Sequence, residues 1–200
     1  MSNKRTWVNR LLGRFGALKR TDLRYKIIQS IGYLLYGRKI GYLSWWQHAG
    51  LSASVLLFHK GKLLIGQRRN MLDANGKYSG IGGFIEMERR ETFETGLVRE
   101  VWEETGIRLD PAKFTAANLL NMNMWYGDIY ELRDMAQVGV TYVYHLTDDE
   151  VDQLVETDEM HNFVFADVAT LDAMYAKGEM AFDGEYRKMR RAFDEGRNTP

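Results

Sequence analysis

Three glutamates that share one face of a predicted helix are the clearest sign of chemistry in this chain of 200 residues. At 100° per residue, Glu100, Glu103 and Glu104 fall within an arc of roughly 100°. Carboxylates this close resist ionisation unless a cation joins them. Mg²⁺ or Mn²⁺ takes oxygen ligands and links carboxylates to substrate phosphates. We therefore predict a divalent-metal site, the alternative being a merely solvated acidic face.

The helix that carries these glutamates is predicted over residues 92–105. Gly106 follows it, where a helix end favours a residue that tolerates the left-handed conformation. Arg99 and Glu91 are spaced so that they can pair across the junction between the preceding loop and the helix. An adjoining apolar arc is expected to face the core: Leu97, Val98, Val101 and Trp102.

This pattern resembles the signature of the Nudix hydrolases, G-x5-E-x7-R-E-U-x-E-E-x-G-U, in which U is aliphatic. Residues 91–107 fit the part from E-x7 onward without a gap. One departure is that seven residues, in place of five, separate Gly83 from Glu91. The resemblance covers about residues 50–176 and implies an α/β/α sandwich with a mixed β-sheet.

The resemblance also implies a role for each matching residue. Its divalent ion, Mg²⁺ or Mn²⁺, would be held by the following ligands: Gly83 through its carbonyl oxygen, Glu100, Glu103 and Glu104. Arg99 and Glu91 would orient the site. The implied reaction is hydrolysis of the pyrophosphate of a nucleoside diphosphate linked to another moiety, for which we favour a nucleotide sugar or an ADP-ribose type compound.

The general base has two candidates in the sequence, Glu103 and an acidic loop. The loop contains Asp128, Glu131 and Asp134.

Two further pairs of residues are candidates for binding the substrate. Arg68 and Arg69 could clamp phosphates, the alternative being a solvent-facing strand end. Trp125 and Tyr126 could stack on a base or, alternatively, anchor the core or a loop.

The elements expected to position these residues alternate between strand and helix patterns, which indicates a mixed α/β domain over residues 49–200. A Gly-rich stretch, residues 75–83, lies between the second strand and the acidic helix. The expected strands are 52–59, 62–68, 114–124, 138–146 and 163–166; the later expected helices are 167–176 and 181–194, with a short turn or helix at 148–154.

Residues 1–48 form a separate, basic segment with ten Lys and Arg and one Asp, a net charge of +9. Its apolar periodicity predicts a helical extension that packs on the main domain. Peripheral contact with a membrane surface, or with RNA, is the alternative. With RNA on this arm, the enzyme would be an RNA 5′-end pyrophosphohydrolase. A third hypothesis is a non-catalytic module that senses a nucleotide.

Several other classes of protein are excluded or disfavoured by composition. The absence of cysteine excludes disulfides, thiolate nucleophiles and Cys-ligated metal sites. The longest apolar stretch, residues 27–46, is interrupted by Arg38 and Lys39, so we expect no transmembrane segment and a cytoplasmic location. The four histidines lack metal-ligand spacing. The oligomeric state stays open.

Overall fold

The computed structural model describes residues 50–70, 74–86, 89–129 and 132–200. For residues 125–129 and 132–136 it describes the backbone and not the side chains. The chain divides into two compact units. The larger comprises Leu51–Asn123 and Val138–Pro200 and holds most of the described residues; the other comprises Met1–Gly50 and Met124–Gln137. The predicted basic extension, residues 1–48, lies outside the described part.

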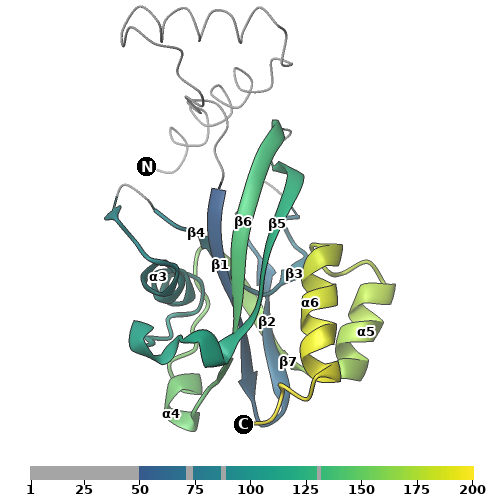
Figure 1. Ribbon diagram of the computed structural model, residues 1–200. Coiled ribbons are helices and arrows are strands. Elements are labelled where there is room, and N and C mark those ends of the chain that lie inside the picture. Colours follow the sequence, from purple (N-terminus) through teal and green to yellow (C-terminus); the bar gives the residue numbers. More distant parts are fainter. Residues whose placement is uncertain (1–49, 71–73, 87–88, 130–131) are drawn as a thin grey trace, which may run out of the picture. The chain divides into compact units, whose positions relative to one another are not determined.

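The larger unit is built on a β-sheet that starts with a hairpin of β1 (Gly50–His59) and β2 (Lys62–Arg68). The turn between them is Lys60–Gly61, both with positive φ, 48° and 78°. The sheet order is β3-β2-β1-β6-β5, while β4 (Ile81–Phe84) pairs with β1 and β7 (Met160–Ala166) with β2. Because β1 and β6 (Leu132–His145) run in the same direction and the hairpins run antiparallel, the sheet is mixed (Figure 1).

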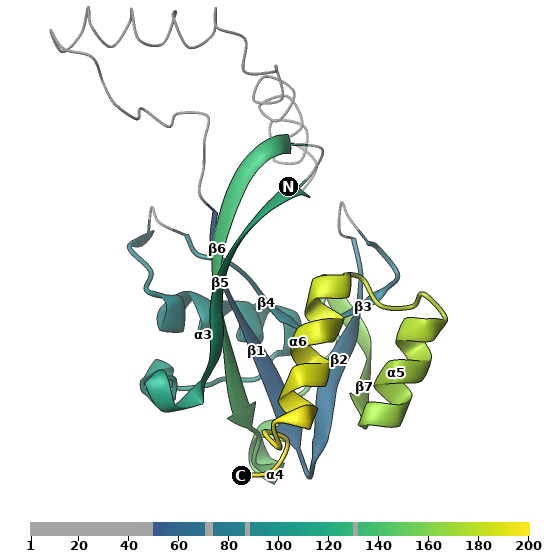
Figure 2. The ribbon, with the colours of Figure 1, turned by 45° about the vertical axis from the view of Figure 1, so that its right-hand side comes forward.

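Helices cover both faces of this sheet. Helix α3 (Phe93–Thr105) lies on one face, and α5 (Val168–Ala176) with α6 (Asp183–Asp194) lies on the other (Figures 1 and 2). Each interface has its own apolar core, one containing Leu57, Leu97 and Val101 and the other Phe58 and Met189. The predicted α/β/α sandwich is therefore confirmed.

The Gly-rich stretch contains two strands that the sequence pattern did not reveal, β3 (Tyr78–Ser79) and β4. In β4, Gly82 has φ of 141° and pairs with Ser54 of β1. A Cβ at Gly82 would lie 2.3 Å from the carbonyl oxygen of Ala53. Glycine is thus required here because the two strands approach each other closely. A search for runs of β-branched residues does not detect such a glycine-containing strand.

The strand expected to begin at residue 114 begins later. Two short 3₁₀ turns, Pro111–Lys113 and Ala116–Asn118, precede β5 (Leu119–Ile129). The hydroxyl of Thr115 accepts a hydrogen bond from the backbone of Ala117 and caps the second turn. The short element after β6 is α4 (Asp148–Val151), capped in the same way by Thr147. No described helix has the length and apolarity needed to cross a membrane.

Candidate functional site

Helix α3 is held at both ends by local capping. Thr92 and Thr95 form a capping box at its start. At its end Gly106, with φ of 76°, donates its backbone N–H to the carbonyl of Trp102. The predicted apolar arc is buried at Leu97 and Val101, but the expectation for Trp102 is wrong because 47% of this side chain is exposed. The guanidinium of Arg108 lies 5.5 Å from its ring centre.

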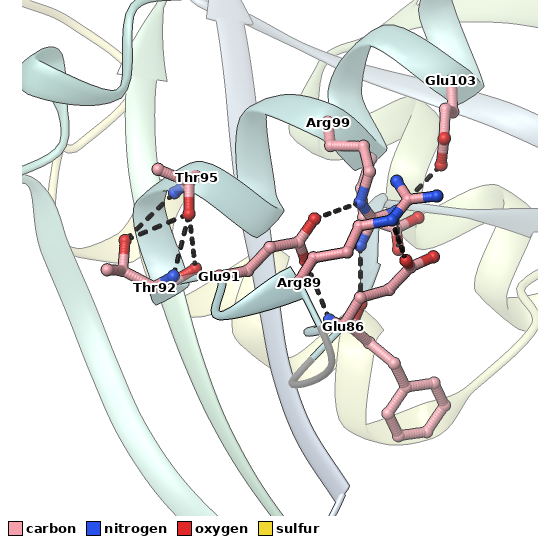
Figure 3. A network of polar contacts seen from close by, with 9 residues as sticks. Glu86, Arg89, Glu91, Thr92, Thr95, Arg99 and Glu103 are labelled. Carbon is pink, nitrogen blue, oxygen red and sulfur yellow. Dashed lines mark hydrogen bonds and ion pairs between the residues drawn. The ribbon is translucent and has the colours of Figure 1, made fainter.

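Arg99 is the centre of the polar network on the acidic face of α3 (Figure 3). Its Nε and Nη2 donate to the two carboxylate oxygens of Glu91, at 2.7 and 3.1 Å. Its Nη1 donates to both Glu100 and Glu103, each at 2.8 Å, and Nη2 also donates to the carbonyl of Phe84 at 2.9 Å. One guanidinium therefore fixes three carboxylates and the end of β4. The predicted Arg99–Glu91 pair is present.

The longer loop before α3 is tied into the same network. Glu91 accepts a hydrogen bond from the backbone N–H of Glu86 at 2.8 Å. Arg89, in the loop, pairs with the carboxylate of Glu86 at 2.7 Å (Figure 3). A Cβ at Gly96 would lie 2.6 Å from Ile85 and 3.0 Å from the Glu91 carboxylate. Glycine at this position lets the loop lie directly against the helix.

The three glutamates differ in their exposure to solvent. Glu104 is 2% exposed and accepts a hydrogen bond from the backbone N–H of Gly82 at 2.8 Å. The side chain of Glu100 is 14% exposed and lies so close to Gly83 that a Cβ there would be 2.5 Å from its carboxyl group. That of Glu103 is 39% exposed. The acidic face is therefore not merely a solvated one.

Burial affects the charge of these groups. Burial raises the pKa of Glu104 well above its usual value, although the hydrogen bond from Gly82 opposes this. Burial also raises the pKa of Glu100 to about 7, against the opposing effect of Arg99. Two carboxylates with raised pKa beside a third need additional positive charge to be fully ionised together.

The donor atoms of this cluster fit a hard divalent cation. They are carboxylate oxygens, the ligands that Mg²⁺ and Mn²⁺ prefer. In the part of the chain that is described, no group of three or more acidic or histidine side chains is arranged so that it could hold a metal ion, and Arg99 bridges Glu100 and Glu103 instead. The assignment of Gly83, Glu100, Glu103 and Glu104 as ligands stays a prediction.

A fourth carboxylate that the sequence analysis missed lies near this cluster. Glu159 lies in the turn before β7. Burial and the negative charge of Glu103 raise its pKa. Its backbone carbonyl accepts a hydrogen bond from the N–H of Arg69 at 2.7 Å. No helical spacing connects Glu159 with α3, and only the pairing of β7 with β2 brings it here.

The two arginines predicted to clamp phosphate are placed differently. Arg68 is half-buried at the end of β2, where its guanidinium lies 5.3 Å from the ring centre of Phe182. Its positive charge acts on the carboxylates of both Glu104 and Glu159 and lowers their pKa, against the larger effect of burial. Arg69 is exposed. Arg68 is thus the one that lies beside the acidic cluster.

The remaining predicted site residues lie in or next to β5 and β6. Trp125, Tyr126 and Asp128 belong to β5, and Asp134 to β6, but their side chains lie outside the described part of the chain. Glu131 also lies outside the described residues.

A hollow of about 610 Å³ lies elsewhere on the larger unit, between β2, β3, β7 and α5. None of the α3 glutamates lines it; its walls include Gln67, Lys77, Tyr78, Val164 and Met174.

Comparison with known proteins agrees with this architecture. The profile of the NUDIX domain matches residues 48–188. A MutT-like protein of Streptomyces ambofaciens is 41% identical over 68 residues, which are 34% of this chain and 40% of that relative. The chain thus spans less than half the length of this curated relative.

Two solved structures share the fold. The NUDIX domain of Shewanella oneidensis NrtR, complexed with ADP ribose, has a TM-score of 0.58 and 19% identity, with 82% of this chain and 97% of that chain covered. A bifunctional NMN adenylyltransferase/ADP ribose pyrophosphatase from Francisella tularensis, complexed with AMP and a Mn ion, has a TM-score of 0.54 and 16% identity, with 87% and 48% covered. The match over most of the chain and the signature on α3 together show that this chain belongs to the NUDIX domain family.

Proposed function

We propose that this chain is a divalent-metal-dependent hydrolase that cleaves the pyrophosphate of a nucleoside diphosphate linked to another moiety. The observation that carries the proposal is the acidic cluster on α3, in which Arg99 orders Glu100 and Glu103 while Gly82 binds Glu104. ADP-ribose or a nucleotide sugar is the favoured substrate class. The two structural relatives described with ADP ribose or as an ADP ribose pyrophosphatase support this class.

Each residue of the cluster has a task in this proposal. Glu100, Glu103 and Glu104 would hold Mg²⁺ or Mn²⁺, with the carbonyl of Gly83 beside Glu100. Such an ion neutralises phosphate oxygens and makes a bound water more acidic. Arg99 holds Glu100 and Glu103 beside each other and would so position the carboxylates that receive the ion.

Proton transfer requires an accessible carboxylate. Glu103 is the most exposed of the three α3 glutamates and can accept the proton of the water that attacks phosphorus. Glu159, in the turn before β7, is a second candidate for accepting this proton. Arg68, whose charge acts on Glu104 and Glu159, would contact a phosphate oxygen of the substrate in this proposal.

The test is hydrolysis of ADP-ribose, UDP-glucose and GDP-mannose with Mg²⁺ or Mn²⁺, with the nucleoside monophosphate product identified. The variant Glu103→Gln should lower kcat by about 100-fold or more, with an unchanged circular dichroism spectrum because the side chain is partly exposed. The matched control is Glu195→Gln, an exposed glutamate at the end of α6. Equal activity of Glu103→Gln and wild type would refute the assignment of the site.

The same assay separates the two alternative functions. An RNA 5′-end pyrophosphohydrolase would leave the panel intact and cleave a 5′-triphosphorylated RNA, with an affinity that falls steeply as salt rises. A nucleotide sensor would bind panel members and release no product with either metal. Either outcome would replace the proposed function.

A further inference from the structure

Helix α6 begins without the side-chain cap that α3 and α5 have. In those two helices Thr92 and Asp167 accept a hydrogen bond from a backbone N–H of the first turn. The N-cap of α6 is Phe182, which has no polar side chain, and no side-chain hydrogen bond caps this helix in the described structure. Serine, threonine, aspartate and asparagine are strongly preferred at an N-cap, so a phenylalanine here needs another explanation.

Packing in the apolar core does not supply this explanation. The side chain of Phe182 is partly buried, but it belongs to neither of the two described core clusters. Three other partly buried phenylalanines of the described chain do pack against one of these clusters: Phe163, Phe165 and Phe193. The ring of Phe182 therefore has its contacts outside the core.

The backbone places the ring of Phe182 against Arg68. The N–H of Ala181 donates to the carbonyl of Tyr78 at 2.8 Å, and Tyr78 pairs in register with Gln67 of β2. The next residue of β2 is Arg68, whose guanidinium carbon lies 5.3 Å from the centre of the Phe182 ring. An aromatic ring attracts a cation within about 6 Å of its centre, so this contact is a cation–π interaction.

Arg68 itself lies beside the acidic cluster. In the pairing of β2 with β7 it is opposite Met160, the residue after Glu159. Its positive charge acts on the carboxylates of Glu159 and Glu104. The ring of Phe182, the guanidinium of Arg68 and these carboxylates are thus successive neighbours between the start of α6 and the glutamates of α3.

An arginine that binds phosphate benefits from a contact of this kind. Its long side chain has many rotamers, and fixing one of them when a ligand binds costs conformational entropy. A ring against the guanidinium restricts these rotamers before the ligand arrives, so less entropy is lost on binding.

We propose that Phe182 is a positioning residue that holds the guanidinium of Arg68 at the acidic cluster, where Arg68 binds a phosphate oxygen of the substrate. This inference rests on the proposed function for the position of the phosphates. Phe182 acts through Arg68 and does not touch the substrate. Loss of the ring therefore weakens binding of the diphosphate group and leaves the chemical step unchanged.

The experiment is a double-mutant cycle between Phe182 and Arg68 in the full chain. Its variants are Phe182→Leu, Arg68→Met and the two together, with Phe182→Tyr as the variant that keeps the ring. Kd is measured by calorimetry with Mg²⁺ for α,β-methylene-ADP, a diphosphate that resists hydrolysis, and KM and kcat are measured for the substrate panel. The matched control is Trp102→Leu, which removes the ring from a second arginine contact, that of Arg108 at 5.5 Å.

We expect Phe182→Leu to raise Kd and KM about threefold to fivefold, the fold-change that corresponds to loss of a cation–π contact at a partly exposed site. Its kcat should stay within about 1.5-fold of the wild type, because an effect on binding alone appears in KM. Phe182→Tyr should keep the wild-type Kd within about 1.5-fold, since tyrosine also attracts a cation. In the Arg68→Met background Phe182→Leu should raise Kd no further, and Trp102→Leu should bind as the wild type does.

Four results would overturn the inference. Two concern the ring alone: an unchanged Kd in Phe182→Leu, or binding by Phe182→Tyr as weak as that by Phe182→Leu, which would assign the loss to packing. The third is an equal effect of Phe182→Leu with and without Arg68, which would show that the ring acts independently of the guanidinium. The fourth is no binding of α,β-methylene-ADP to the wild type.

Failure of the proposed function would give a different result. The wild type would then hydrolyse no member of the panel although it binds α,β-methylene-ADP. In that case the Kd values of the cycle still decide whether Phe182 positions Arg68 for a phosphate.

Discussion

Replacing Arg99 by methionine should destabilise the protein strongly, because one guanidinium satisfies three carboxylates at once. The change removes both hydrogen bonds to Glu91 and one each to Glu100 and Glu103. The carbonyl of Phe84 also loses a donor. The side chains of Arg99, Glu91 and Glu100 are only 13%, 10% and 14% exposed, so water replaces the lost partner poorly.

The magnitude follows from the burial of these groups. Removing one partner of a buried ion pair costs about 3–5 kcal/mol. We expect a loss of this size in the free energy of unfolding, measured by urea denaturation in EDTA at pH 7. Arg99→Lys should recover little of it, because a single ammonium cannot replace the planar set of donors.

The control is an arginine whose ion pair is solvent-exposed. Arg191 pairs with Glu195 at 2.6 Å and is 53% exposed. Arg191→Met should therefore cost less than about 1 kcal/mol. If Arg99→Met cost no more than Arg191→Met, the view that Arg99 organises the acidic cluster would be refuted.

Three further results should follow. Gly82→Ala should lower the free energy of unfolding by at least about 2 kcal/mol, since its Cβ would lie 2.3 Å from a carbonyl oxygen; Gly76→Ala, in open space at φ of 79°, should cost about 1 kcal/mol in the same denaturation assay. Arg99 lowers the pKa of Glu91. The free energy of unfolding that Glu91→Gln loses relative to the wild type should therefore be constant above about pH 5 and should shrink at lower pH, as acid protonates the wild-type carboxylate. A loss that does not depend on pH down to about pH 2 would contradict this. Thr92→Val should lower the melting temperature of the protein by removing an N-cap worth about 1 kcal/mol, and an unchanged value would show that the cap is dispensable.

The acidic helix could be predicted from the sequence because the residues that define it are close together in the chain. A helix brings residues three and four apart onto one face, so Glu100, Glu103 and Glu104 needed no tertiary contact to be grouped. The C-cap at Gly106 likewise follows from backbone conformation alone. The pair formed by Arg99 and Glu91 was also foreseen, because only a short loop and two helical turns separate them.

Burial and long-range pairing could not be predicted in the same way. The sequence does not distinguish Glu104 from Glu103, yet one is 2% exposed and the side chain of the other 39%. That difference arises because β4 lies against the helix and offers the N–H of Gly82 to Glu104. Trp102, which was expected in the core, is 47% exposed, so burial of the apolar arc stops short of this residue.

What the sequence by itself determined is the type and spacing of the chemical groups, since these depend on helical geometry within a few turns. The tertiary structure alone decided which of them lie together across the chain: Glu159 beside the acidic cluster through the pairing of β7 with β2, and Arg68 beside both from the end of β2. The physical reason is that strand pairing and burial join residues far apart in the chain, and their energies depend on the whole packed arrangement.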